Sequence, residues 1–235
     1  MTTAVVLQAR MGSVRLPGKV LALLGGRTVL AHCIERLRTH SNLPVIVATT
    51  TQAEDDLVVR EATRLDATVF RGAVDDVLGR FAMVVRAYGL DDLVRATADN
   101  PAVDLDAPQR TLALLRRTNA DHIVERGLPI GAAVEAMSAK ALLLADEMAT
   151  TAFDREHVTP WLRRERRAAA FEAIAPGRLR APKLRLTVDT PEDLDGIRRV
   201  FAAVDVADPA PLDAIIAGAA RLEPAARGRS GTERR

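Results

Sequence analysis

The chain has 235 residues, of which 48% are hydrophobic and 3% aromatic, and its formal net charge at pH 7 is +2. This predicts a globular core of Ala, Val, Leu and Ile, and the even charge balance gives no support for a nucleic-acid partner. The single cysteine, Cys33, excludes an internal disulfide and a cysteine-based zinc site. There is neither a signal-peptide pattern nor an apolar run of about 18 residues, so we expect a cytoplasmic protein with no membrane partner.

In the first half of the chain, short apolar runs alternate with helical patterns. Strands are expected at residues 3–8, 43–50, 67–72 and 91–101, and helices at 28–40, 53–65, 75–89 and 107–118. This repeated alternation predicts an α/β fold in which a mostly parallel sheet is covered by helices on both faces. Ligands of such sheets bind at the carboxyl ends of the strands, so the polar residues that follow each strand are the candidates for function.

The alternation weakens between residues 120 and 180. Residues 121–138 predict two strands joined by a Gly/Pro turn, and 139–150 and 155–167 predict helices, although Pro160 interrupts the second. Residues 182–204 predict a strand that runs into a helix, with Thr190 as its N-cap and Pro191 in the first turn. We assign residues 1–222 to a single domain and expect residues 223–235 to be a disordered tail.

The loop after the first strand, QARMGSVRLPGK, combines three cations with two glycines. Gly12 and Gly18 let backbone N–H groups approach an anion, and Arg10, Arg15 and Lys19 supply the positive charge that a bound triphosphate requires. The spacing matches neither the GxxxxGK[ST] motif nor the GxGxxG dinucleotide motif. From these residues alone, an anion site and a solvated loop both stay open.

Two aspartates stand at the ends of predicted strands, Asp99 in RATADNP and Asp189 in LTVDTPEDL. Two carboxylates at neighbouring strand ends suit Mg²⁺, with phosphate oxygens of a substrate completing its coordination. The alternatives are a turn residue for Asp99 and a neighbour of the helix N-cap for Asp189. We expect Asp193 in the first helical turn rather than among the ligands.

Taken together, these stretches resemble one family. QARMGSVRLPGK resembles the loop of the cytidylyltransferases, which include enzymes that activate 3-deoxy-manno-octulosonate and sialic acid with CTP. FRGAVDDVLGRF, VRATADNPAVD, REHVTPWL and LRLTVDTPEDL follow in the order of the spore-coat polysaccharide (SpsF-like) branch. The resemblance spans roughly residues 4–200. It implies a three-layer, Rossmann-like (GT-A-like) nucleotidyltransferase fold, with a β-hairpin insertion at about 125–140 that forms a homodimer and faces the acceptor.

The resemblance also implies a reaction in which CMP passes from CTP to an acidic sugar or to a phosphorylated or phosphonate small molecule, with release of pyrophosphate. The implied catalytic residues are Arg10, Arg15, Lys19 and Asp99, and Asp99 and Asp189 would hold the Mg²⁺ cofactor. The implied nucleotide contacts are Gln8, Ala9, Gly12, Ser13, Arg71, Gly72 and Arg80. For the last three, a helix cap at Asp75 or Asp76 and an Asp76–Arg80 ion pair are an equally simple explanation.

Glu135, Arg155, Glu156 and His157 are the acceptor-side candidates. Glu135 is a charge on an otherwise apolar strand, and Arg155, Glu156 and His157 could meet an anionic acceptor, although a structural role is the simpler one for His157. Two other functions stay open: transfer from GTP or UTP to a sugar phosphate, and a catalytically inactive nucleotide-binding protein. The glycine-richer GxGTRL loop typical of sugar-phosphate nucleotidyltransferases is absent. The presence of both Asp99 and Asp189 argues against an inactive nucleotide-binding protein.

Overall fold

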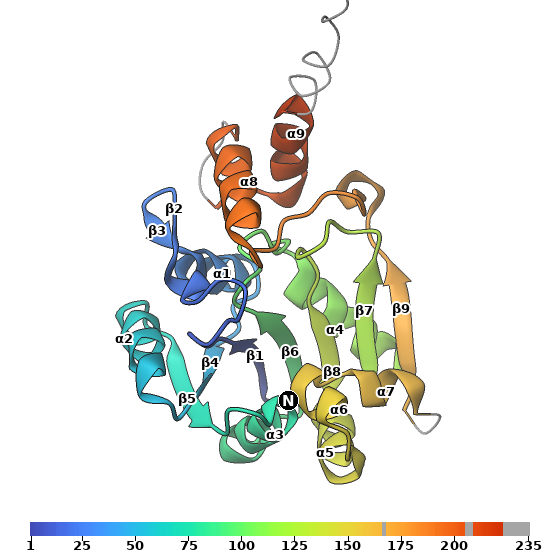
Figure 1. The fold of residues 1–235 in the computed structure, drawn as a ribbon. Coiled ribbons are helices and arrows are strands. Elements are labelled where there is room, and N and C mark those ends of the chain that lie inside the picture. Colours follow the sequence, from blue (N-terminus) through green and yellow to red (C-terminus); the bar gives the residue numbers. More distant parts are fainter. Residues whose placement is uncertain (166–167, 205–208, 223–235) are drawn as a thin grey trace, which may run out of the picture.

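The computed structural model describes residues 1–165, 168–204 and 209–222. Within them, a sheet of seven strands forms the centre of the molecule (Figure 1). In chain order its strands are β1 (Thr3–Gln8), β4 (Val45–Thr50), β5 (Thr68–Gly72), β6 (Asp92–Thr97), β7 (His122–Arg126), β8 (Glu135–Ser138) and β9 (Ala170–Ile174). The spatial order is β5-β4-β1-β6-β8-β7-β9, and every pair is parallel except the two that include β8. The mostly parallel sheet predicted from the sequence is therefore confirmed.

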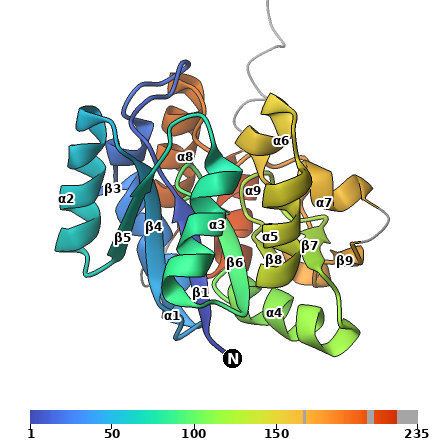
Figure 2. The same ribbon diagram turned by 90° about the horizontal axis from the view of Figure 1, so that it is seen from below.

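Helices cover both faces of this sheet (Figures 1 and 2). On one face lie α1 (Val29–Thr39), α2 (Asp56–Arg64), α4 (Ala107–Thr118), α8 (Pro191–Ala202) and α9 (Leu212–Leu222). On the other face lie α3 (Val77–Tyr88), α5 (Ala139–Met148), α6 (Ala152–His157) and α7 (Pro160–Arg164). Successive residues of β1 enter the two cores in turn: Val5 and Leu7 pack with the first set, and Ala4 and Val6 with the second. A strand that is buried on both faces has this continuous apolar sequence.

Side-chain caps fix where several helices begin. The Asp76 side chain accepts a hydrogen bond from Gly79 N at the start of α3, and Thr190 accepts one from Asp193 N at the start of α8. The Asp193 carboxylate in turn accepts from the backbone of Thr190, which completes a capping box. The caps at Asp76 and Thr190, and the place of Asp193 in the first helical turn, are as predicted from the sequence.

The structure corrects two sequence predictions. Residues 182–188 form no strand; this segment makes one isolated bridge, between Ile130 and Arg185, because it runs between two loops rather than along a sheet edge. The single helix expected at 155–167 is two short helices, α6 and α7, which are separated at Val158. This residue has φ 71°, and Pro160 can only begin a new helix. The predicted tail, 223–235, lies outside the described residues.

Three further features complete the fold. The two strands predicted in residues 121–138 are confirmed as the antiparallel pair β7–β8, and both belong to the main sheet. A small antiparallel pair, β2 (Leu23–Leu24) with β3 (Arg27–Thr28), lies outside that sheet. One-turn 3₁₀ helices occur at η1 (Lys19–Leu21), η2 (Ala53–Asp55) and η3 (Gly177–Leu179). In the described part of the chain, no helix combines the length and the apolar character that crossing a bilayer requires.

Candidate active site

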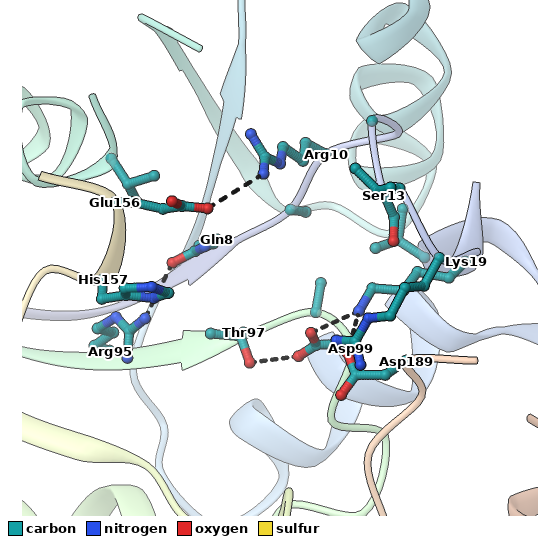
Figure 3. Close-up of a pocket in the computed structure, with 17 residues that line it drawn as sticks. Gln8, Arg10, Ser13, Lys19, Arg95, Thr97, Asp99, Glu156, His157 and Asp189 are labelled. Carbon is teal, nitrogen blue, oxygen red and sulfur yellow. Dashed lines mark hydrogen bonds and ion pairs between the residues drawn. The ribbon is translucent and has the colours of Figure 1, made fainter. Parts of the chain in front are cut away.

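A cavity of about 310 Å³ opens at the carboxyl ends of β1 and β6, beneath the loop that follows β1 (Figure 3). The two strands are parallel neighbours in which Gln8 pairs with Thr97, so the segments that follow them begin side by side. The sequence-predicted residues that line the cavity are Gln8, Ala9, Arg10, Gly12, Ser13, Arg15, Lys19, Asp99, Glu156, His157 and Asp189. Residues from four separate stretches of the sequence thus meet where a parallel sheet binds its ligands.

Hydrogen bonds of its own backbone and one from Met11 to Asp55 fix the conformation of the loop after β1. Gly18 N donates to Met11 O at 3.0 Å, which closes the segment into a compact turn, and Gly18 has φ 70°, a conformation that favours glycine. Met11 N donates to the buried carboxylate of Asp55 at 2.6 Å and so fixes the base of the loop. The amides of Gly12 and Val14 take part in no hydrogen bond among the described residues. They are therefore free to bind the oxygens of an anion.

Lys19 joins the two aspartates that the sequence singled out. Its Nζ lies 2.8 Å from Asp99 Oδ2 and 2.9 Å from Asp189 Oδ1 (Figure 3). The Arg15 guanidinium lies 3.1 Å from the same Asp189 oxygen. Arg185 contacts the other Asp189 oxygen at 2.7 Å. Burial alone would raise the pKa of Asp189, but Lys19, Arg15 and Arg185 outweigh it and hold that pKa below its usual range. Asp189 is therefore held as a carboxylate by three cations, of which Lys19 is shared with Asp99 and Arg185 with Asp193.

The two aspartates come together by a different route from the one predicted. Asp99 follows β6, as expected, but Asp189 follows the extended segment rather than a strand. A backbone hydrogen bond from Val188 N to Asp99 O, 2.8 Å long, brings that segment to the end of β6. Thr97 Oγ1 also donates to Asp99 Oδ1 at 2.5 Å.

The donor set of this pair fits Mg²⁺. Both side chains offer carboxylate oxygens, which hard cations prefer, and one ammonium group already lies within hydrogen-bond distance of both. The described residues contain no group of three or more His, Cys, Asp or Glu side chains arranged to hold a metal ion. Two carboxylates suit Mg²⁺, which keeps several bound waters and takes further oxygens from the phosphates of a substrate.

The acceptor-side candidates divide into two groups. Glu156 and His157 line the cavity, and Glu156 lies 3.9 Å from the Arg10 guanidinium, so α6 faces the loop across the opening (Figure 3). Arg155 points elsewhere: it pairs with Asp76 at the start of α3 and with Asp146 of α5, which ties three helices together. The hydrogen bond to Asp76 raises the pKa of Arg155 against the opposing effect of burial.

Arg71, Gly72 and Arg80 are not among the residues that line the cavity. Arg71 donates to Thr50 O and Gln52 O, both at 2.8 Å, and also pairs with Asp56. Arg80 is 1% exposed and donates to Ala73 O; burial, together with the charge of Arg10, lowers its pKa to about 10. A Cβ on Gly72 would lie 3.0 Å from the Arg80 side chain, so this glycine makes room for Arg80. The expected Asp76–Arg80 pair does not form, because Asp76 pairs with Arg155.

Glu135 lies at the centre of a buried charged cluster next to the cavity. Its carboxylate accepts hydrogen bonds from Arg95 at 2.7 Å, from Thr159 at 3.1 Å and from Arg163. His122 Nε2 lies 3.4 Å away. Burial would raise the pKa of Glu135, but Arg95, His122 and Arg163 hold it well below its usual range. In the described structure, these partners of Glu135 belong to the same chain. The contact with an acceptor or a second subunit that the sequence suggested for Glu135 stays a prediction.

Sequence reasoning did not single out Arg95, Asp55 or Arg185. Arg95 had a detectable signal, because it is the one charge within the apolar run LVRAT, as Glu135 is within its own strand. Asp55 and Arg185 had none: each acts on a residue of another loop or on a neighbour within an irregular segment, and only the folded chain shows the contact.

A doubly wound α/β sheet with a cationic, glycine-containing loop and two carboxylates that converge at the carboxyl end of its central strands is typical of nucleotide-binding enzymes. A profile of one such family, the cytidylyltransferases, matches residues 4–212. The chain belongs to this family and is a nucleotidyltransferase.

Individual relatives agree with this assignment. The chain is 36% identical over 190 residues to an uncharacterized protein of Methanocaldococcus jannaschii, covering 80% of this chain and 78% of that one. It is 33% identical over 205 residues to the spore coat polysaccharide biosynthesis protein SpsF of Bacillus subtilis, covering 83% and 85%. A cytidylyltransferase structure from Leptospira borgpetersenii superposes over the whole of both chains with a TM-score of 0.88 and 26% identity. A CTP complex of CMP:2-keto-3-deoxy-manno-octonic acid synthetase shares the fold, with a TM-score of 0.66 at 16% identity over 86% of this chain and 99% of that one.

Proposed function

We propose that this protein transfers CMP from CTP to a small anionic acceptor in a Mg²⁺-dependent reaction that releases pyrophosphate. The observation that carries the proposal is the single cluster in which Lys19 bridges Asp99 and Asp189 beside Arg15. Such a cluster holds, within one cavity, both the cations that a triphosphate needs and the carboxylates that its metal ion needs.

In this proposal, the loop after β1 binds the triphosphate. The free amides of Gly12 and Val14 and the guanidinium groups of Arg10 and Arg15 contact phosphate oxygens, and Lys19 leaves the two aspartates for the β- and γ-phosphates. The arginines have carboxylate partners in the cavity, Glu156 and Asp189, but these ion pairs are partly exposed, so their loss costs little. The same cations then stabilise the pyrophosphate that leaves.

Asp99 and Asp189 would hold the metal ion once Lys19 has moved. When bound, Mg²⁺ would neutralise charge at the α-phosphate and lower the pKa of an attacking hydroxyl. Thr97 orients the Asp99 carboxylate through its 2.5 Å hydrogen bond, and the capping box keeps Asp189 at the start of α8. Because these groups are fixed before the substrate enters, positioning and electrostatics supply most of the rate.

The kinship with SpsF, which is named for spore coat polysaccharide biosynthesis, supports an acceptor that is a precursor of a surface polysaccharide. The match to the cytidylyltransferase family supports CTP as the nucleotide over GTP or UTP.

Pyrophosphate release from each of the four NTPs, measured with panels of sugar acids and polyol phosphates, tests the proposal. We expect turnover with CTP to exceed that with the other NTPs by about 100-fold and to stop when EDTA removes divalent ions. Equal turnover of GTP or UTP, or turnover that persists in EDTA, would overturn it.

A further inference from the structure

A second cavity, of about 210 Å³, lies beside the one just described. Arg95 and Thr97 of β6 line both cavities and so form the wall between them. The second cavity is also lined by Asn100, by Gly131 and by Glu135 of β8. Nothing in the proposed binding of CTP uses this space.

The Arg95 guanidinium is incompletely satisfied by the protein. Nη1 donates to Glu135 Oε2 at 2.7 Å. Nη2 makes a longer contact of 3.3 Å with Gln8 Oε1 (Figure 3). Its Nε is buried and has no hydrogen-bond partner among the described residues. A buried donor that lacks a partner costs free energy, and a ligand that supplies an acceptor removes that cost.

The charges around Glu135 do not balance. This single carboxylate pairs with both Arg95 and Arg163, so the two guanidinium groups carry one positive charge more than the carboxylate cancels. Arg163 is half-exposed, but Glu135 is 7% exposed and the side chain of Arg95 16%, so water screens the charge of Arg95 poorly. The cluster can therefore accept one negative group from a ligand.

Asn100 adds a second requirement. Its Nδ2 donates to Thr97 Oγ1 at 2.8 Å, and Thr97 in turn gives its only hydroxyl proton to Asp99. This chain fixes the orientation of the amide and leaves Asn100 Oδ1 buried and without a partner in the described structure. An unpartnered carbonyl oxygen accepts a hydrogen bond, so the ligand must offer a hydroxyl or another donor.

We propose that the second cavity binds the acceptor, that Arg95 contacts its anionic group, and that Asn100 Oδ1 accepts a hydrogen bond from one of its hydroxyls. The ligand class is a small polyhydroxylated anion, with either a carboxylate or a phosphate as its charged group. This inference rests on the proposed function. In this assignment, Arg95 selects acceptors that carry an anionic group. The acceptor lies next to Asp99, where the α-phosphate would lie.

Calorimetric titration of the full chain, saturated with α,β-methylene-CTP and Mg²⁺, tests this assignment. One arm uses the carboxylates 3-deoxy-manno-octulosonate and gluconate, the other uses glycerol 3-phosphate and ribitol 5-phosphate, and sorbitol serves as the neutral polyol. We expect at least one anion, and not sorbitol, to bind the wild type, and Arg95→Met to weaken that binding about 30-fold while the nucleotide affinity stays within about twofold. The arm that binds identifies the charged group.

Arg116→Met is the matched control, because Arg116 pairs with Asp92 at the opposite end of β6. Its anion affinity should equal that of the wild type. If Arg95→Met does not fold, Arg95→Lys decides: it keeps the charge opposite Glu135 but loses the fork, and we expect about tenfold weaker anion binding.

Two results would overturn the assignment: no anion of either arm binds the nucleotide-loaded wild type, or Arg95→Met and Arg95→Lys bind an anion as tightly as the wild type does. Failure of α,β-methylene-CTP itself to bind would instead refute the proposed function, so the two failures are distinguishable. If the nucleotide analogue does not bind, the anions are titrated into the free protein. The assignment then requires that Arg95→Met weakens their binding there as well.

Discussion

Two charged clusters lie at neighbouring positions along β6 and the turn that follows it, and they differ in how cations and carboxylates are shared. In the first, Lys19 contacts both Asp99 and Asp189, and Arg15 contacts Asp189, beside an open cavity. We propose that both cations exchange these partners for phosphates, and we call this group the exchangeable cluster. In the second, Arg95 and Arg163 share one buried carboxylate, Glu135. We call this second group the fixed cluster. The comparison indicates that an exchangeable cluster suits the binding of a triphosphate with its metal ion, whereas a fixed cluster suits recognition of the acceptor.

Removing a charge from the exchangeable cluster should have the largest effect on activity. Asp99→Ala or Lys19→Ala should lower CTP turnover by about 10³-fold, because each removes a group that we place on the reacting phosphates or their metal ion. Pyrophosphate release gives the rate, and thermal unfolding shows whether the fold is kept. Asp195→Ala on the exposed side of α8 is the control, and wild-type turnover in either active-site variant would refute the mechanism.

Removing the carboxylate of the fixed cluster should act mainly on stability. Glu135→Ala leaves Arg95 and Arg163 without their shared partner, and we expect it to lower the free energy of unfolding by about 3 kcal/mol. Urea denaturation followed by circular dichroism measures the loss. If stability changes by no more than in a surface variant, the cluster is not fixed in the sense argued above.

The pH dependence of stability should separate Glu135 from the other carboxylates. Its pKa is lowered in the folded state, so the stability it contributes is present above the pKa of the unfolded chain and is lost as the pH falls toward the folded value. Between pH 5 and pH 3, the wild type should lose about 1.5 kcal/mol more than Glu135→Gln, which has no group to protonate. Parallel loss in the two proteins, measured by urea denaturation at each pH, would contradict this contribution.

The exchangeable cluster also predicts an effect on metal affinity without nucleotide. Because the Lys19 ammonium lies between Asp99 and Asp189, Lys19→Met should raise the affinity of the free protein for Mn²⁺ by about tenfold. Electron paramagnetic resonance of free Mn²⁺ measures this binding directly and needs no catalysis. An unchanged affinity would mean that the lysine does not compete with the ion.

The smallest effect should come from Arg71, which belongs to neither cluster. Arg71→Ala removes hydrogen bonds to two backbone carbonyls, and we expect a loss of about 1 kcal/mol in stability with the KM for CTP changed by less than about threefold. Steady-state kinetics and urea denaturation check both. If the KM for CTP rises tenfold or more in a stable variant, Arg71 contacts the nucleotide, as the family resemblance implies.

The secondary structure of the first hundred residues was predictable because it follows from the pattern of apolar residues within each segment. Each strand is a short apolar run and each helix has one apolar face, so β1, α1, β4 and α3 fall within a few residues of their predicted bounds. The second half depends on distant partners. The segment at 182–188 is extended, as its sequence suggests, but among the described residues its backbone pairs with Ile130 and Asp99 rather than with a strand. No periodicity encodes that outcome.

The site was predictable to a similar extent. The loop cations and both aspartates share a chemistry that the sequence displays, and the structure gathers them in one cavity. Arg155 and Arg71 lie in equally suggestive motifs, yet they bind Asp76 and backbone carbonyls, because helix packing decides which way a long side chain turns. The homodimer and the cytoplasmic location stay predictions.

The central claim is that the exchangeable cluster releases Lys19 to a triphosphate and gives its two aspartates to a metal ion. A crystal structure of the protein with CTP and Mn²⁺, with the ion located by anomalous scattering, tests it most directly. We predict Mn²⁺ bound by Asp99 and Asp189, with Lys19 on the β- or γ-phosphate. Nucleotide bound outside the β1–β6 cavity, or Lys19 still joined to both aspartates in the complex, would contradict the account.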